Sequence, residues 1–203
     1  MYYIVGPDER PNGYVHLSES RQWVPWLVRN IPTALDPDVR RRLNSNLKHL
    51  LVGLELKSAL ISGHRRREPG QRNVLFEPYF QNLISEFCVA AFSVIEGLGA
   101  AHWLDAQGAD GGTGPQVYRR QWKPTLCLVY DPDGVHGLGD TVDQIFEVRD
   151  RLHQDRLGAR GEIDWHAMSY ERAFRPAACA IRTLLLRHPD LVPEDTNLTN
   201  EPD

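Results

Sequence analysis

The sequence predicts an all-α protein, an up-and-down helical bundle with extra helices at its N-terminus. Apolar residues recur at helical spacing over residues 36–63, 83–104 and 141–158. Asp36 followed by Pro37 is a helix-start signal. The segments between the periodic stretches contain glycine, proline and aspartate, which favour loops. Long helices separated by loops therefore account for most of the chain.

Two elements precede the long helix predicted at residues 36–63. Residues 1–5 are β-prone and are followed by a Gly-Pro pair, which favours a short edge strand or an ordered arm. Residues 18–30 predict a short helix with its two tryptophans on one side. Within the long helix, Gly53 indicates a close approach by a neighbouring element.

Residues 83–104 form the most apolar stretch, and its apolar arc covers more than half of a helical wheel. We therefore expect this helix at the centre of the bundle. Glu86 and Glu96 lie on the remaining polar arc. Residues 117–130 fit either a strand or a helix interrupted by Pro124, and we prefer the helix.

The last predicted helix begins near residue 165 or 169 and ends at His188, where Pro189 stops it. Its inner side is formed by small and aliphatic residues, namely Ala173, Ala177, Ala180, Ile181, Leu184 and Leu185. Residues 189–203 are acidic and contain proline, so we expect a frayed or disordered tail.

Composition narrows the classes of function. The formal net charge of −4 excludes a global basic field, so nucleic-acid binding would need a local patch. Basic clusters at residues 40–42, 64–67 and 119–120 are expected to be solvated. Three cysteines without Cys-x-x-Cys spacing argue against a zinc site or a disulfide framework, and no phosphate-binding loop or other cofactor motif is present.

The sequence shows no signal peptide, and we expect no apolar run of transmembrane length. We therefore expect a cytoplasmic protein with no membrane partner.

The stretch 141–158 carries the residues that suggest chemistry. Asp140 is the predicted helix cap, and Arg149 and His153 follow one turn apart at the edge of the apolar side. Arginine stays charged while histidine exchanges a proton near neutral pH. Such a pair is suited to hold a phosphate and to move a proton beside it, as metal-free RNA cleavage requires.

A structural interpretation of the same residues is open. Arg149 would pair with a glutamate of a neighbouring helix, either Glu86 or Glu96. His153 would stabilise the C-terminal end of its helix, where a cation is favoured. Ion pairs of this kind are more common than catalytic ones.

The order of the predicted helices and the segment Val148-Arg149-Asp150-Arg151-Leu152-His153 resemble the HEPN superfamily. The resemblance covers residues 76–188, with residues 1–75 as an N-terminal helical extension and 189–203 as the tail. It implies a compact helical bundle that acts as a homodimer. The motif is shortened here, since three residues separate Arg149 from His153 where the family has four to six.

The resemblance also implies a function. Active family members are metal-independent endoribonucleases, often toxins or defence effectors, so RNA and a cognate antitoxin or effector are expected partners. Arg149 would be the phosphate-binding or transition-state cation, Asp150 the polar residue after it, and His153 the acid/base or the residue that activates the 2′-hydroxyl. The alternative is a catalytically silent, dimeric binding or scaffolding protein. Metal-dependent, serine or cysteine hydrolases are disfavoured, because the sequence has no His-Glu-x-x-His or Gly-x-Ser-x-Gly motif.

Overall fold

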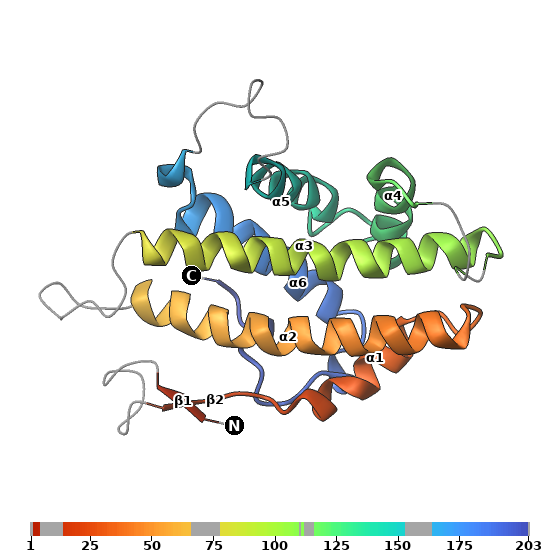
Figure 1. Cartoon of the computed structure of the whole chain (residues 1–203), viewed down its shortest axis with the longest axis horizontal. Coiled ribbons are helices and arrows are strands. Elements are labelled where there is room, and N and C mark those ends of the chain that lie inside the picture. Colours follow the sequence, from red (N-terminus) through yellow and green to blue (C-terminus); the bar gives the residue numbers. More distant parts are fainter. Residues whose placement is uncertain are drawn as a thin grey trace, which may run out of the picture.

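A computed structural model describes residues 2–4, 14–65, 78–109, 111, 116–152 and 164–202. The predicted all-α fold class is confirmed, since long helices form the body of this part of the chain (Figure 1). The α-helices in the described residues are α1 (Val24–Asn30), α2 (Pro37–Arg65), α3 (Tyr79–Ala106), α4 (Arg119–Tyr130), α5 (Leu138–Leu152) and α6 (Arg175–Leu185).

Helix α3 runs through the middle of the bundle, as its apolar arc predicted. Helix α2 packs along one side of it, α4 and α5 lie on the other side, and α6 packs behind (Figure 1). Ile84, Cys88 and Ile95 are fully buried along α3. The helix meets neighbours in several directions because only a narrow strip of its surface is polar.

A short hairpin precedes the helices. Strands β1 (Tyr2–Ile4) and β2 (Tyr14–His16) pair antiparallel, with Tyr3 opposite Val15. The strand predicted at residues 1–5 is therefore confirmed over residues 2–4, and it lies apart from the helical core (Figure 1).

The long helix begins where its capping residue predicted. The Asp36 carboxylate accepts hydrogen bonds from the backbone N–H groups of Asp38 (2.9 Å) and Val39 (3.1 Å). These bonds satisfy donors that have no partner inside the helix, which is how aspartate stabilises a helix start. Helix α2 continues to Arg65, two residues past the predicted end at Gly63.

Residues 119–130 are helical, so the preference for a helix in this stretch is confirmed. The buried side chains Trp122, Leu126 and Tyr130 follow one another at intervals of four. This spacing places all three on the face that packs against α3. Pro124 removes one backbone donor, and the buried face holds the helix together despite that loss.

The last helix begins with a π-helical turn at Tyr170–Phe174 and continues as α6. All six residues predicted for its inner side are buried. Pro176 lies in the first turn of α6, where its missing N–H costs little.

The expected disorder of the tail is wrong for residues 189–202. The Asn197 side-chain amide donates to the backbone carbonyl of Glu55 (2.9 Å), and the Thr199 carbonyl accepts from Arg182 Nε (3.0 Å). Leu198 is 5% exposed. Composition predicted disorder because the tail is acidic, but these few residues find partners on α2 and α6. The predicted domain boundary after residue 75 lies outside the described residues.

Glu55 of α2 fastens the N-terminal segment as well. It is fully buried, and its carboxylate accepts from the Ser18 N–H (3.0 Å) and the Ser18 hydroxyl (2.7 Å). A buried carboxylate is costly unless hydrogen bonds replace its lost water. The two ends of the chain therefore meet at the same point of α2.

By length and composition, α3 is long and apolar enough to cross a membrane, with a mean hydropathy of 1.6 over its most apolar window. The expectation that no apolar run has transmembrane length is therefore wrong by length and composition. Of that window, 56% is buried against other parts of the protein. The apolar residues of α3 thus supply the core of the bundle.

The close approach predicted at Gly53 is also wrong, since a Cβ built there has no neighbour within 4 Å. The close approach is at Gly99 of α3 instead. A Cβ at Gly99 would lie 2.6 Å from the ring of Trp122. That indole is fully buried, so it has little room to move.

Gly53 and Gly99 form a matched pair for testing this packing, because both lie inside helices. We expect Gly99→Ala to lower the free energy of unfolding by about 1–3 kcal/mol, since the methyl group overpacks the core. We expect Gly53→Ala to raise it by up to about 1 kcal/mol through helix propensity. Denaturant titration of both variants measures the difference, and equal stability would contradict the packing described here.

Candidate functional site

Helix α5 begins at Leu138, so Asp140 lies in its first turn. The prediction that Asp140 caps this helix is therefore wrong. Asp131, at the end of α4, bonds to this start instead. Its carboxylate accepts from the backbone N–H groups of His136 (3.1 Å) and Leu138 (3.0 Å). Burial by itself raises the pKa of Asp131, but the donors at Leu138 and His136 outweigh it, and the net pKa is lowered. The charged carboxylate thus ties the start of α5 to α4.

Helix α5 packs through Val142 and Ile145, which are buried. Arg149 and Asp150 follow on the same helix and are both half-buried. Helix α5 is described to Leu152, and His153 lies outside the described residues. The structure therefore places two of the three predicted site residues.

Arg149 contacts an aromatic ring of α3. Its guanidinium carbon lies 5.6 Å from the centroid of Phe92, within the range of a cation–π interaction. Glu86 faces the other way and pairs with Lys57 of α2 (3.7 Å). Within the described residues no ion pair joins Arg149 to Glu86 or Glu96, so the predicted structural pairing is not observed there.

A second arginine approaches the same group of rings from α4. The guanidinium of Arg119 lies 3.7 Å from the centroid of Phe146, and Phe146 lies 5.7 Å from Phe92. The two phenylalanines thus have an arginine against each of them. The aromatic pair supports both cations without neutralising their charge.

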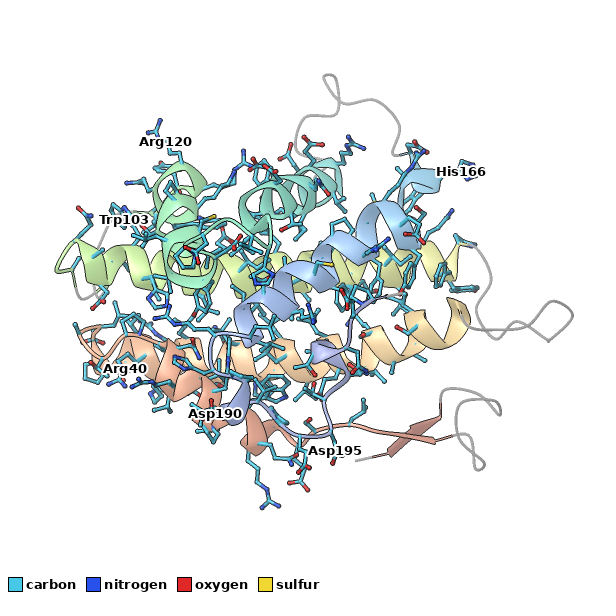
Figure 2. All side chains as sticks on the ribbon, turned by 180° about the vertical axis from the view of Figure 1, so that it is seen from behind. Arg40, Trp103, Arg120, His166, Asp190 and Asp195 are labelled. Carbon is cyan, nitrogen blue, oxygen red and sulfur yellow. The ribbon has the colours of Figure 1, made fainter. Side chains whose placement is uncertain are left out.

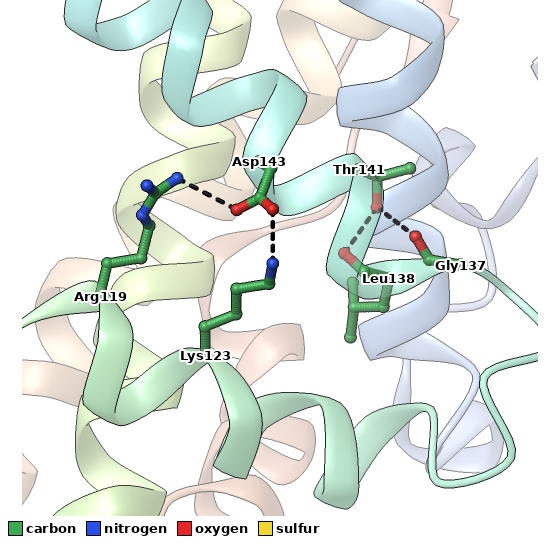
Figure 3. A network of polar contacts seen from close by, with 6 residues as sticks. All are labelled: Arg119, Lys123, Gly137, Leu138, Thr141 and Asp143. Atoms are coloured by element: carbon green, nitrogen blue, oxygen red, sulfur yellow. Dashed lines mark hydrogen bonds and ion pairs between the residues drawn. The ribbon is translucent and has the colours of Figure 1, made fainter.

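Asp143 joins α4 to α5 beside these rings. Its carboxylate oxygens bind Arg119 (3.1 Å) and Lys123 (2.6 Å), which lie one turn apart on α4 (Figure 3). Figure 3 also shows the Thr141 hydroxyl donating to the carbonyls of Gly137 and Leu138 in the first turn of α5. Arg119 is therefore held in place, which differs from the solvated cluster expected at residues 119–120.

A second polar group lies around His102 of α3, and no sequence motif predicted it. Its Nε2 lies 3.2 Å from the Tyr130 hydroxyl, and Arg187 lies over the Tyr130 ring while donating to the Val129 carbonyl (2.8 Å). These contacts bring together the end of α4 and the residues just after α6. No motif marks the residues, because they are far apart in the sequence and meet only in the fold.

Burial, and then the charge of Arg187, lower the pKa of His102 to about 4, although the charge of Asp105 and the Asn30 backbone raise it. The neutral ring is thus held against Tyr130 inside the fold, which makes His102 a structural residue.

The metal-ligating side chains of the described residues do not gather into one cluster, and Cys88 lies in the core. They contain no group of three or more histidine, cysteine, aspartate or glutamate side chains able to hold a metal ion. Burial raises the pKa of the Cys88 thiol to about 12, and that thiol donates to the Ala173 carbonyl at 3.4 Å. Cys88 is thus a core residue and not a nucleophile.

The lowered pKa of His102 predicts a loss of stability in acid. Below pH 6.5 the unfolded chain takes up a proton that folded His102 refuses until about pH 4, so stability falls across this window. The unfolding free energy lost through protonation of His102 is at most about 3 kcal/mol. We expect His102→Gln to flatten the fall in unfolding free energy between pH 7 and pH 4, as measured by urea titration.

His49→Gln is the matched control, because His49 is an exposed histidine of α2. It should leave the acid sensitivity of the wild type unchanged. If both variants follow the wild-type curve, His102 does not determine the pH dependence.

Comparisons with known proteins do not identify a family for this chain. No family model, no curated protein and no solved structure matches this chain. The resemblance to the HEPN superfamily thus stays a prediction from helix order and the Arg149–His153 segment.

Proposed function

We propose that the protein is a metal-independent endoribonuclease of the HEPN type, with Arg149 and His153 at its active site. The observation that supports the proposal best is the environment of Arg149. It is half-buried at the edge of α5 against the Phe92 ring, and within the described residues no carboxylate neutralises it. A cation held in this way keeps its N–H donors for a phosphate.

The proposed chemistry needs no metal ion. The 2′-hydroxyl of RNA attacks the adjacent phosphorus atom, and the bond from phosphorus to the 5′-oxygen breaks. The products are a 2′,3′-cyclic phosphate and a free 5′-hydroxyl. His153 would move the proton, Arg149 would stabilise the negative charge on the phosphate oxygens, and Asp150 would be the polar residue beside them.

The contacts between α4 and α5 support this site indirectly. Asp143 binds two cations of α4, and Asp131 bonds to the first turn of α5. Both contacts restrict how α5 can move relative to α4. A fixed helix is what a catalytic arginine needs, because small displacements of a catalytic group lower the rate strongly.

The biological setting that we propose follows from the same resemblance. The protein would act in the cytoplasm as a homodimer, as a toxin or defence effector that a cognate antitoxin or effector partner controls. RNA would be its substrate.

A catalytically silent binding or scaffolding protein is the second candidate. The short spacing favours it, since only Asp150, Arg151 and Leu152 separate Arg149 from His153. Such a protein would dimerise in the same way without cleaving RNA.

An RNA cleavage assay in EDTA separates the two candidates. We expect wild type to cleave, and Arg149→Ala and His153→Ala each to lose 10²-fold or more in rate, a loss of roughly the size that removal of an acid/base group gives. Arg151→Ala is the matched control. Arg151 lies two residues after Arg149, is exposed and pairs only weakly with Glu147 (3.7 Å), so its loss should leave the rate unchanged.

Circular dichroism of each variant confirms that it is folded. Equal inactivity of folded wild type and variants on a range of RNAs would sink the catalytic proposal and favour the silent protein. An equal loss in Arg151→Ala would show that general charge, and not the Arg149 site, matters.

A further inference from the structure

The first three turns of α2 line an open hollow on the protein surface. Its volume is about 400 Å³, and its described lining residues are Pro37, Arg40, Arg41, Asn44, Ser45 and Lys48. These positions are three or four residues apart, so they form one continuous face of the helix. Figure 2 shows Arg40 at this part of the molecule, well away from Arg120 on α4.

The same face is covered further along the helix. Glu55 lies seven residues after Lys48 and so points in a similar direction. There Ser18 covers the carboxylate, and Asn197 bonds to the backbone. Segments near the two ends of the chain therefore cover this face at Glu55, while the basic first turns line the open hollow.

The charge of the open half is positive and only partly compensated. Arg41 pairs with Asp38 at 3.3 Å, but both side chains are more than 70% exposed, so the pair is weak. Arg40 is half-buried, and its Nε is out of contact with water and has no acceptor in the described part of the chain. Lys48 has no carboxylate partner there either. A half-buried cation without a counter-charge favours binding of an anion.

We propose that this face of α2 binds the phosphodiester backbone of a nucleic acid strand. Arg40 and Lys48 are about 12 Å apart along the helix axis, with the Asn44 and Ser45 donors between them. An open, elongated row of cations and polar donors matches a strand of phosphates, while a small ligand needs an enclosed site.

This surface of α2 is separate from the proposed active site. Helix α2 lies on the opposite side of α3 from α5, so this binding does not involve Arg149 (Figure 1). It rests on the proposed function only for the choice of RNA as one probe. Contacts to phosphate alone do not distinguish RNA from DNA, so both strands should bind.

The test is fluorescence anisotropy with labelled single-stranded RNA and DNA of the same sequence, in EDTA and at several salt concentrations. We expect Arg40→Gln and Lys48→Gln each to weaken binding of both strands about 3- to 10-fold. Each should also reduce the slope of log affinity against log salt by about 0.7, the loss of one phosphate contact. The DNA strand lacks the 2′-hydroxyl and is not cleaved, so its binding is measured separately from any ribonuclease activity.

Arg42→Gln is the matched control, because Arg42 is an exposed arginine of α2 outside the hollow. It removes the same charge and should change affinity and salt slope much less. Circular dichroism confirms that each variant is folded.

Several outcomes would overturn the proposal. They are no binding of either strand at low salt, an equal loss in Arg42→Gln, or competition by inorganic phosphate as strong as by the strands, which would indicate a small-ligand site. Binding through Arg40 and Lys48 without any RNA cleavage would uphold this surface and remove the proposed activity. RNA cleavage by a protein whose strand binding is unchanged in Arg40→Gln and Lys48→Gln would uphold the activity and remove this surface.

Discussion

The contact between Gly99 and Trp122 sets how closely α4 approaches α3, and much of the bundle depends on it. Because Gly99 has no side chain, the indole lies directly against the backbone of α3. Trp122 in turn contacts Phe92, and Phe92 contacts both Phe146 and Arg149 of α5. The position of α5, and with it the candidate arginine, therefore follows from a packing contact on a different helix. Close-packed interiors transmit such constraints because they leave no free volume.

Polar contacts add to the core packing in positioning α5. Asp131 and Asp143 both join α4 to α5, one at the start of α5 and one beside the phenylalanines. The ion pairs of the half-exposed Asp143 contribute modestly to stability. Their effect here is geometric, since they fix the rotation of α5 and hence the direction of Arg149. His102 contacts Tyr130 at another junction, where the end of α4 meets the residues that follow α6.

The two sides of α3 differ in how their cations are compensated. On the α5 side, Arg119 and Lys123 share Asp143, and Arg149 rests on an aromatic ring. On the α2 side, both chain ends fasten near Glu55 and leave a basic face open. A chain with a net charge of −4 can thus present local positive surfaces, because the sign of a surface depends on which residues the fold brings together.

Sequence alone determined the fold class, the central place of α3, the capped start of α2 and the inner side of α6, because helical periodicity and local capping are properties of neighbouring residues. It also pointed to Arg149 as a residue at the edge of the apolar side of its helix. The tertiary structure decided the rest. The close approach at Gly99 and not Gly53, the docked tail, Asp131 rather than Asp140 at the start of α5, and the ring beneath Arg149 all depend on partners distant in the chain. A local pattern cannot specify such partners, since burial and pairing arise only when separate helices meet.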